Sequence, residues 1–340
     1  MPEPVGAGRE DAVGSPAEPG PVRIAVDLLG GDRAPAVVVD GALRALAADP
    51  ALGLLLVGPP EVADLIVGAL PAVDRTRATV RPVREVVAMA DHPTRATRAD
   101  TTVGAAVRAV VAGAADAVVS AGSTGATVTA AVLGFGRWPG VRRPALAATL
   151  PALAGPVVLL DVGGSLEARP TTLLQHAVLG AAYASVAHDV RQPRIGLLSV
   201  GTETGKGDRT RRAVDAALVA GSLAVDARYV GLVEGFEATA GARADVVVTD
   251  GFTGNVLLKG IEGAYALAGE PPQRGAAPRA AALLGVGGTV VVCHGGAEGA
   301  DVASGIALAA LLCRRSAVRR VRALFPDPIR DIPTDTEVSA

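Results

Sequence analysis

The chain contains few aromatic side chains and has no large excess of charge of either sign. Phe, Trp and Tyr make up 2% of the 340 residues, so aromatic platforms that stack unpaired bases are not expected. The formal net charge is −2 at pH 7, which provides no overall basic field for nucleic acid or anionic lipid. We therefore expect no nucleic-acid partner, and any phosphate site must be local.

Cysteine and long hydrophobic runs are scarce as well. Cys293 and Cys313 form neither a CxxC pair nor part of a His-rich cluster, so the sequence predicts no disulfide framework and no metal site, and suits a reducing cytoplasm. No strongly apolar run reaches the roughly 20 residues that span a bilayer. The polar start of the chain lacks the features of a signal peptide. These absences predict a soluble, cytoplasmic protein.

Small aliphatic residues and glycine are abundant instead. Half of the residues are hydrophobic and 42 are Gly, so the chain can bury a large core and make many tight turns. We predict a disordered leader at 1–21 and a flexible tail at 326–340. Between them, residues 22–325 are predicted to form one domain, either undivided or as two lobes that share one sheet.

Segments typical of strands and helices alternate along the chain. Short continuous aliphatic runs predict strands covered on both faces, and longer Ala-rich stretches predict helices between them. This alternation predicts an α/β fold with a mainly parallel sheet. The predicted strands are 22–27, 53–58, 115–120, 156–161, 194–199, 245–249 and 288–293, and the predicted helices are 36–48, 100–113, 123–134, 170–188, 207–222, 253–268 and 299–317.

Turns through Gly beside a small polar or charged residue follow most of these strands. They read VDLLGGD, VVSAGSTGA, LLDVGGS, LLSVGTETGKGD, VVTDGFTGN and VVCHGGAEG. Because the carboxyl ends of parallel strands meet at one edge of a sheet, we expect these loops to converge on one crevice. Free N–H groups at the helix starts would favour an anion there. The patterns GxxxxGK[ST] and GxGxxG are absent, which disfavours nucleotide hydrolysis and hydride transfer.

Taken together, the loops resemble one family, the phosphate acyltransferases of the PlsX type. The similarity runs from VRIAVDLLGGDRAP through DHPTRATR, SAGSTGA, RRPALAATLP, LLDVGGS and PRIGLLSVGTETGKGD to ADVVVTDGFTGNVLLKGIEG, LLGV and CHG, over roughly residues 22–318. The resemblance implies a Rossmann-like α/β/α sandwich with a mainly parallel sheet. That fold is related to the phosphotransacetylases and to isocitrate-dehydrogenase-like enzymes.

The same resemblance implies a reaction and its partners. Family members pass a fatty acyl group from acyl carrier protein to inorganic phosphate, giving acyl phosphate for phospholipid synthesis, and need no organic cofactor. A cytoplasmic homodimer with at most weak membrane association is also implied, with a functional link to a membrane glycerol-3-phosphate acyltransferase. Because phosphate is already a usable nucleophile, the protein mainly has to position it and to stabilise the developing oxyanion.

Lys206 and Asn255 match the two catalytic positions of the family. Lys206 carries its charge in a Gly loop and, with Lys259, is one of two lysines among 32 Lys and Arg residues; a solvated loop lysine is the alternative. Asn255 contacts substrate, caps the predicted helix, or does both. His294 can donate to phosphate, although a lone His is more often structural. The other candidates for binding substrate or phosphate are Gly30, Gly31, Asp32, Ser123, Thr124, Gly125, Gly163, Gly205, Gly207, Thr253 and Gly254.

Other residues near the strand ends are expected to be structural. The carboxylates of Asp27, Asp161 and Asp250, and also that of the candidate Asp32, are expected more often to fix loop amides, because direct contact with phosphate would be repulsive. Cys293 ends a predicted buried strand without a visible base, so we expect it to pack rather than to act as a nucleophile.

Some positions depart from the family pattern. Ser123 and Ser165 stand where Asn is usual, and Leu232 with Phe236 replaces polar residues, which removes side-chain donors. A long helical excursion of the family is shortened here to 264–282, which weakens the case for dimerisation and membrane approach. Two alternatives therefore stay open: an acyl-CoA-dependent phosphate acyltransferase, and a non-catalytic paralogue that binds carrier protein or phosphate.

Overall fold

The computed structural model describes residues 20–325, except 99, 168, 222, 224 and 269–279. The predicted tail at 326–340, and the predicted leader up to residue 19, lie outside the described residues. The same is true of the middle of the shortened segment 264–282.

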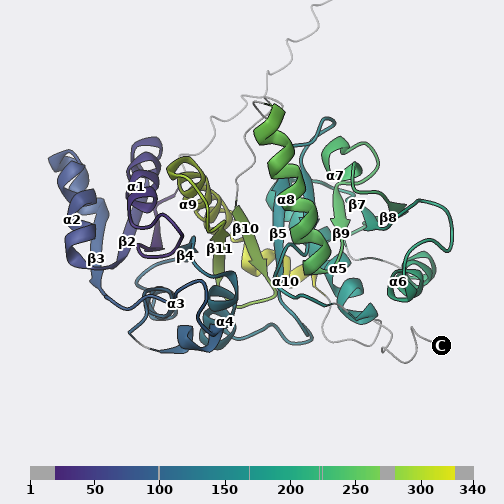
Figure 1. The fold of residues 1–340 in the computed structure, drawn as a ribbon, viewed down its shortest axis with the longest axis horizontal. Coiled ribbons are helices and arrows are strands. Elements are labelled where there is room, and N and C mark those ends of the chain that lie inside the picture. The colour runs from purple at the N-terminus through teal and green to yellow at the C-terminus, as the bar shows by residue number, and fades with distance from the viewer. Residues whose placement is uncertain are drawn as a thin grey trace, which may run out of the picture.

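The described strands form one eleven-stranded sheet in the order β3-β2-β1-β4-β11-β10-β5-β6-β9-β7-β8 (Figure 1). Every strand predicted from the sequence is present, and β3, β5, β8 and β10 are additional. The strands are β1 (Val22–Asp27), β2 (Leu52–Gly58), β3 (Ala78–Pro82), β4 (Ala117–Ser120), β5 (Ala145–Leu150), β6 (Val157–Leu160), β7 (Arg194–Leu198), β8 (Arg228–Val233), β9 (Val246–Val248), β10 (Ala280–Leu284) and β11 (Thr289–Cys293).

Helices cover both faces of this sheet. One apolar layer gathers α1, α2, α5, α6, α9 and α10, and the other gathers α3, α4, α7 and α8. The helices are α1 (Ala36–Ala48), α2 (Pro60–Ala69), α3 (Thr102–Val111), α4 (Thr124–Phe135), α5 (Pro170–His188), α6 (Arg209–Ala220), α7 (Glu237–Ala240), α8 (Gly251–Ala268), α9 (Gly299–Arg314) and α10 (Ala317–Leu324), with short 3₁₀ helices at Ala72–Arg77 and Pro93–Thr97. Among the described residues, no helix has both the length and the apolar character needed to cross a bilayer.

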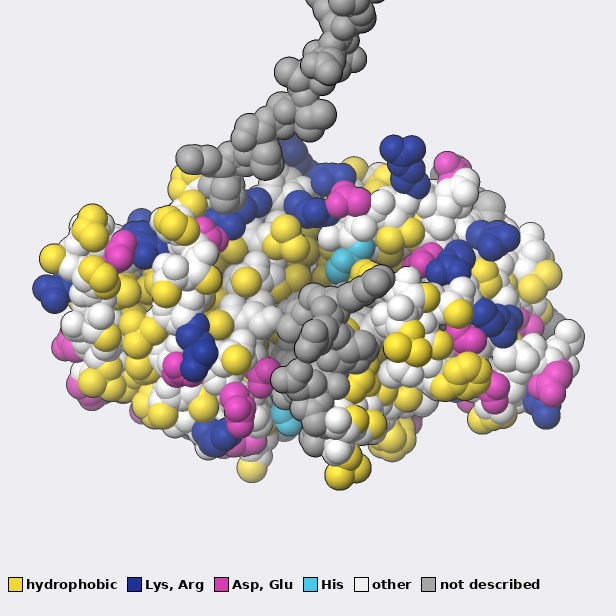
Figure 2. Space-filling model, turned by 90° about the horizontal axis from the view of Figure 1, so that it is seen from above, with side chains coloured by type: hydrophobic (Ala, Val, Ile, Leu, Met, Phe, Trp, Pro, Cys, Tyr) yellow, Lys and Arg dark blue, Asp and Glu magenta, His cyan; other side chains and the backbone are white. Residues whose placement is uncertain are grey.

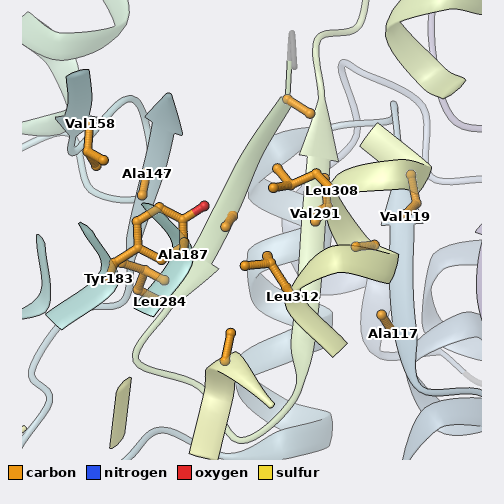
Figure 3. Packing of buried hydrophobic residues seen from close by; sticks show 14 of the residues in the cluster. Ala117, Val119, Ala147, Val158, Tyr183, Ala187, Leu284, Val291, Leu308 and Leu312 are labelled. Carbon is orange, nitrogen blue, oxygen red and sulfur yellow. The ribbon is translucent and has the colours of Figure 1, made fainter. Parts of the chain in front are cut away.

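The core explains why the strand sequences are continuously apolar. Figure 3 shows Leu308 and Leu312 of α9 beside Val291 of β11, and Tyr183 of α5 near Leu284 of β10. Neighbouring strand residues point to the opposite layer, so both sets of side chains are buried. Burying each Val or Leu side chain stabilises the fold by about 1.5–3 kcal/mol. The α/β/α sandwich with a mainly parallel sheet is therefore confirmed.

The direction of the strands reverses in the middle of the sheet. β10 is antiparallel to both β11 and β5, and β5 is antiparallel to β6, whereas the outer strands pair in parallel. These three reversals place the carboxyl ends of β1, β4 and β11 at one edge, here called the first edge. The carboxyl ends of β6, β7 and β9 lie at the opposite, second edge. The prediction that all the Gly turns meet at one edge is therefore wrong.

Candidate active site

The loops after β1 and β4 are joined at the first edge by a buried polar pair. Ser120 Oγ donates to Asp27 Oδ2 at 2.8 Å. Burial raises the pKa of Asp27, although hydroxyls and backbone amides donate to its carboxylate. A Cβ at Gly30 would lie 2.7 Å from the Gly122 nitrogen, so only Gly permits this approach. Asp27 thus holds two of the Gly turns together.

The loop after β11 is hydrogen-bonded to the loop after β1. The Asp32 backbone N–H donates to the Gly295 carbonyl at 2.9 Å, and Gly31 has a φ of +121°, which an L side chain rarely adopts. The exposed His294 accepts at Nδ1 from the Gly296 N–H at 3.2 Å. His294 is thereby brought beside the loop that carries Gly31 and Asp32.

Helix α4 completes the first edge. Ser123 caps it, since its Oγ accepts from the Ala126 N–H at 3.4 Å, and Thr124 is the first helical residue. A Cβ at Gly125 would lie 3.1 Å from Pro93 Cγ, so Gly125 packs against the neighbouring 3₁₀ helix. The free N–H groups and the positive dipole end of α4 begin at this point.

At the second edge, Asp161 organises the loop after β6. Its fully buried carboxylate accepts from the backbone N–H groups of Leu146, Gly163, Gly164 and Ser165 at 2.7–3.1 Å and from Ser165 Oγ at 3.0 Å. Gly163 adopts a φ of +133°. The N–H and hydroxyl of Ser165 are therefore both engaged in hydrogen bonds within the loop.

The first turn of α8 packs onto this loop. A Cβ at Gly254 would lie 1.9 Å from the Asp161 carbonyl oxygen, and Asn255 Nδ2 donates to the Val162 carbonyl at 3.0 Å. Asp250 rather than Asn255 caps the helix, because its Oδ1 accepts from the Thr253 N–H at 2.8 Å. The interpretation of Asn255 as the helix cap is therefore wrong, since α8 begins at Gly251.

Arg211 of α6 ties the GKGD loop to α8. Its guanidinium donates to Asp250 Oδ2 at 2.6 Å and to the Leu198 carbonyl at 2.9 Å, and it pairs with Asp208, which caps α6. Lys206 lies between Gly205 and Gly207, whose φ values are +86° and +92°.

The Lys206 side chain is 52% exposed, and its Nζ lies 4.0 Å from Glu203 Oε2.

Burial alone would raise the pKa of Asp250, but the hydrogen bonds from Thr253 and Arg211 outweigh it and hold that pKa below its ordinary value.

A cavity of about 420 Å³ brings residues of both edges together. Its lining comes from β5, β10 and the end of β11, from α8, and from the starts of α4 and α9; Figure 1 shows where these elements lie in the fold. Of the predicted site residues, Thr124, Asn255 and His294 line it. Lys206 is not among the described residues that line it. The apolar wall includes Leu146, Ala148, Leu150, Val162, Leu258 and Ile261.

Helix α8 crosses the part of the sheet where the strand direction reverses, from the second edge to the first. The helix starts beside Val162 at the second edge, and ten residues after Asn255 the hydroxyl of Tyr265 donates to the Pro151 carbonyl, beyond β5 at the first edge, at 2.8 Å. Both ends of α8 therefore face the same cavity. This crossing allows groups from opposite edges to form one site.

Sequence reasoning missed Lys259, Glu262 and Tyr265, which also line the cavity. Lys259 Nζ contacts Glu262 Oε2 at 2.7 Å. The signal was present in their spacing, because Asn255, Lys259 and Glu262 follow one another at intervals of four and three residues, which places them on one face of a helix.

Comparison with known proteins identifies the family. The model of the family described as "Fatty acid synthesis protein" matches residues 22–270. A phosphate acyltransferase of Thermobifida fusca (strain YX) is 39% identical over 330 residues, which cover 88% of this chain and 89% of that protein. This chain belongs to the phosphate acyltransferase family. A second member, from Heliobacterium modesticaldum, is 36% identical over 340 residues, which cover 92% of this chain and 100% of that protein.

Solved structures place this phosphate acyltransferase in a wider fold group. A phosphotransacetylase from Streptococcus pyogenes superposes with a TM-score of 0.62 at 21% identity, over 88% of this chain and 94% of that chain. A 4-hydroxythreonine-4-phosphate dehydrogenase from Klebsiella pneumoniae gives a TM-score of 0.51 at 14% identity, over 88% and 100%. These likenesses confirm the predicted fold relationship to phosphotransacetylases. Family membership makes the chain an acyl-transferring enzyme.

Proposed function

We propose that this phosphate acyltransferase moves a fatty acyl group from the thioester of acyl carrier protein to inorganic phosphate. The observation that carries the proposal is the cavity over β5 and β10. Its wall is mostly apolar, as an aliphatic chain requires, and its few polar groups come from the two sheet edges. Pockets that bind small ligands typically combine an apolar lining with a few convergent polar groups.

The proposed reaction needs no covalent enzyme intermediate. An oxygen of HPO₄²⁻ bonds to the thioester carbonyl carbon while the C–S bond breaks. The electron pair leaves with sulfur, and the proton of the phosphate ends on the carrier thiol. The products are acyl phosphate and free carrier protein. Positioning of the two reactants supplies much of the rate enhancement in such a reaction.

We assign roles to residues of both edges. The N–H groups at the start of α4, with Thr124, and His294 are proposed to contact phosphate from the first edge. Asn255, held by the Val162 carbonyl, is proposed to donate to the thioester oxygen as negative charge develops there. Lys206 is proposed to stabilise the same charge from the GKGD loop.

The cellular setting follows from the same proposal. We propose a cytoplasmic homodimer whose acyl phosphate enters phospholipid synthesis through a membrane glycerol-3-phosphate acyltransferase. The role in lipid synthesis is supported by the family's description as a fatty acid synthesis protein and by the relatives named phosphate acyltransferase.

The test is to incubate purified protein with palmitoyl-carrier protein and phosphate and to measure release of free carrier thiol. We expect release that depends on phosphate and that is accompanied by acyl phosphate. Turnover with palmitoyl-CoA but not with palmitoyl-carrier protein would show that the acyl donor is acyl-CoA. Tight binding of carrier protein without release would identify a non-catalytic paralogue.

A further inference from the structure

Lys259 is the only lysine or arginine among the described residues that line the cavity. The other charged side chains there are the acidic Glu262, Glu298 and Asp301. Glu298 and Asp301 already cap α9 reciprocally, and Arg33 pairs with Glu298 from outside. A dianion that enters this cavity therefore meets three carboxylates, whose repulsion must be offset by a fixed cation.

The contact between Lys259 and Glu262 contributes little to helix stability. The two side chains are 35% and 28% exposed, and i,i+3 pairs stabilise an isolated helix by only about 0.2–0.5 kcal/mol. Lys lies N-terminal to Glu, which is the less favourable order along a helix. Both partners nevertheless lie in the lining of the cavity, about one to two turns beyond Asn255.

The choice of residue type is also informative. Lys206 and Lys259 are the only lysines in a chain with 32 Lys and Arg residues. An ammonium group binds phosphate as a compact point charge, whereas a guanidinium binds it through a planar fork of N–H groups. Lys259 lies in the lining of the cavity, whereas Lys206 lies in the GKGD loop outside the described lining.

We propose that Lys259 binds the acceptor phosphate and that Glu262 holds its ammonium group until the phosphate displaces it. This inference rests on the proposed function and deepens it, because it names the group that binds the acceptor. Lys206 then serves the thioester end of the site and Lys259 the phosphate end. Glu262 competes with phosphate for the same cation.

The competition makes an unusual prediction for the two partners of the ion pair. Lys259→Met keeps the aliphatic stem and removes the charge, so it should weaken phosphate binding by roughly 10-fold or more, the effect of one charge-assisted hydrogen bond. Glu262→Gln should strengthen phosphate binding several-fold, because it removes the competing anion. Lys259→Arg should restore part of the affinity. A purely structural ion pair would change in the same direction whichever partner is removed.

The experiment is calorimetric titration of the whole protein with sodium phosphate against sodium chloride of equal ionic strength, without acyl donor. Arg84→Met is the matched control, since it removes a cation from the surface pair with Glu61 and should leave phosphate affinity unchanged. Circular dichroism checks that each variant is folded. In turnover, Lys259→Met should raise the KM for phosphate more than it lowers kcat.

The inference is overturned if Lys259→Met binds phosphate like the wild type, if both partners shift affinity in the same direction, or if the wild type binds no phosphate. Its failure is distinguishable from failure of the proposed function. Phosphate binding that depends on Lys259, without release of carrier thiol, would reject the proposed transfer and retain the phosphate site.

Discussion

Lys206 offers a direct test of the assignment made from sequence. Its side chain is 52% exposed and contacts Glu203 at 4.0 Å, so its removal should leave the fold intact. We expect Lys206→Ala to lower turnover by roughly 100-fold or more, because the charge is needed mainly as the oxyanion forms. Release of carrier thiol under saturating substrates measures the effect.

Glu203→Gln is the control for this change, because it removes the ion-pair partner of Lys206 and leaves the lysine in place. We expect its turnover to remain within about threefold of wild type, since exposed pairs contribute little. Near wild-type turnover in Lys206→Ala would remove Lys206 from the mechanism.

Cys293 lines the cavity but is unsuited to nucleophilic attack. The residue is 1% exposed, and burial, followed by the charge of Asp301, raises the pKa of its thiol to about 12. The thiol therefore stays protonated at neutral pH. We expect Cys293→Ser to retain turnover while losing about 1–3 kcal/mol of stability through the buried hydroxyl. Detection of an acyl-Cys293 species by mass spectrometry would contradict direct attack by phosphate.

At the scale of the element, the start of α8 should be sensitive to acid. The pKa of Asp250 is held below its ordinary value of 3.8, so its contribution to the free energy of unfolding is complete above about pH 3.8 and is lost as the pH falls through the folded-state pKa. We expect Asp250→Asn to lower Tm at neutral pH but to flatten its decline in acid. Asp40→Asn, in an exposed pair with Arg44, is the control; parallel acid curves for wild type and Asp250→Asn would contradict the prediction.

Two glycines in the same helix provide a matched pair of substitutions. A Cβ at Gly254 would lie 1.9 Å from the Asp161 carbonyl oxygen, whereas a Cβ at Gly260 would meet nothing within 4 Å. We expect Gly254→Ala to cost about 1–3 kcal/mol or more by overpacking and to lower turnover by displacing Asn255. Gly260→Ala should stabilise the protein by about 0.5–1 kcal/mol, because alanine favours a helix. Thermal unfolding of both variants decides this, and equal Tm values would argue against close packing of α8 on the Asp161 loop.

At the scale of the whole molecule, the face shown in Figure 2 is not suited to strong binding of anionic membranes. Figure 2 shows Lys and Arg side chains interspersed with Asp and Glu over the visible face, without one continuous basic field. Attraction to anionic lipid needs such a cluster or an exposed amphipathic helix. We expect little sedimentation with vesicles that contain anionic lipid at physiological salt. Substantial co-sedimentation that persists after deletion of residues 1–19 would show that another surface binds the membrane.

The sequence alone determined the elements with strong local signals. Continuous Val and Leu runs predicted the strands later seen as β1, β2, β4, β6, β7, β9 and β11, because strands buried on both faces carry a local apolar signature. The family was also recognisable, since glycines at positions of positive φ and residues that cap or join loops recur in short motifs. Lys206 and Asn255 were proposed on that basis, and their catalytic roles remain predictions.

Tertiary structure decided where those motifs meet. β5 and β10, with the sequences ALAATL and AAALL, were not predicted because alanine favours helices and carries no strand signal. Their antiparallel pairing reverses the sheet and separates the Gly turns onto two edges. Only the path of α8 across that reversal brings Asn255 and Lys259 into the cavity lined by Thr124 and His294. Strand direction depends on pairing between distant segments, which no local pattern encodes.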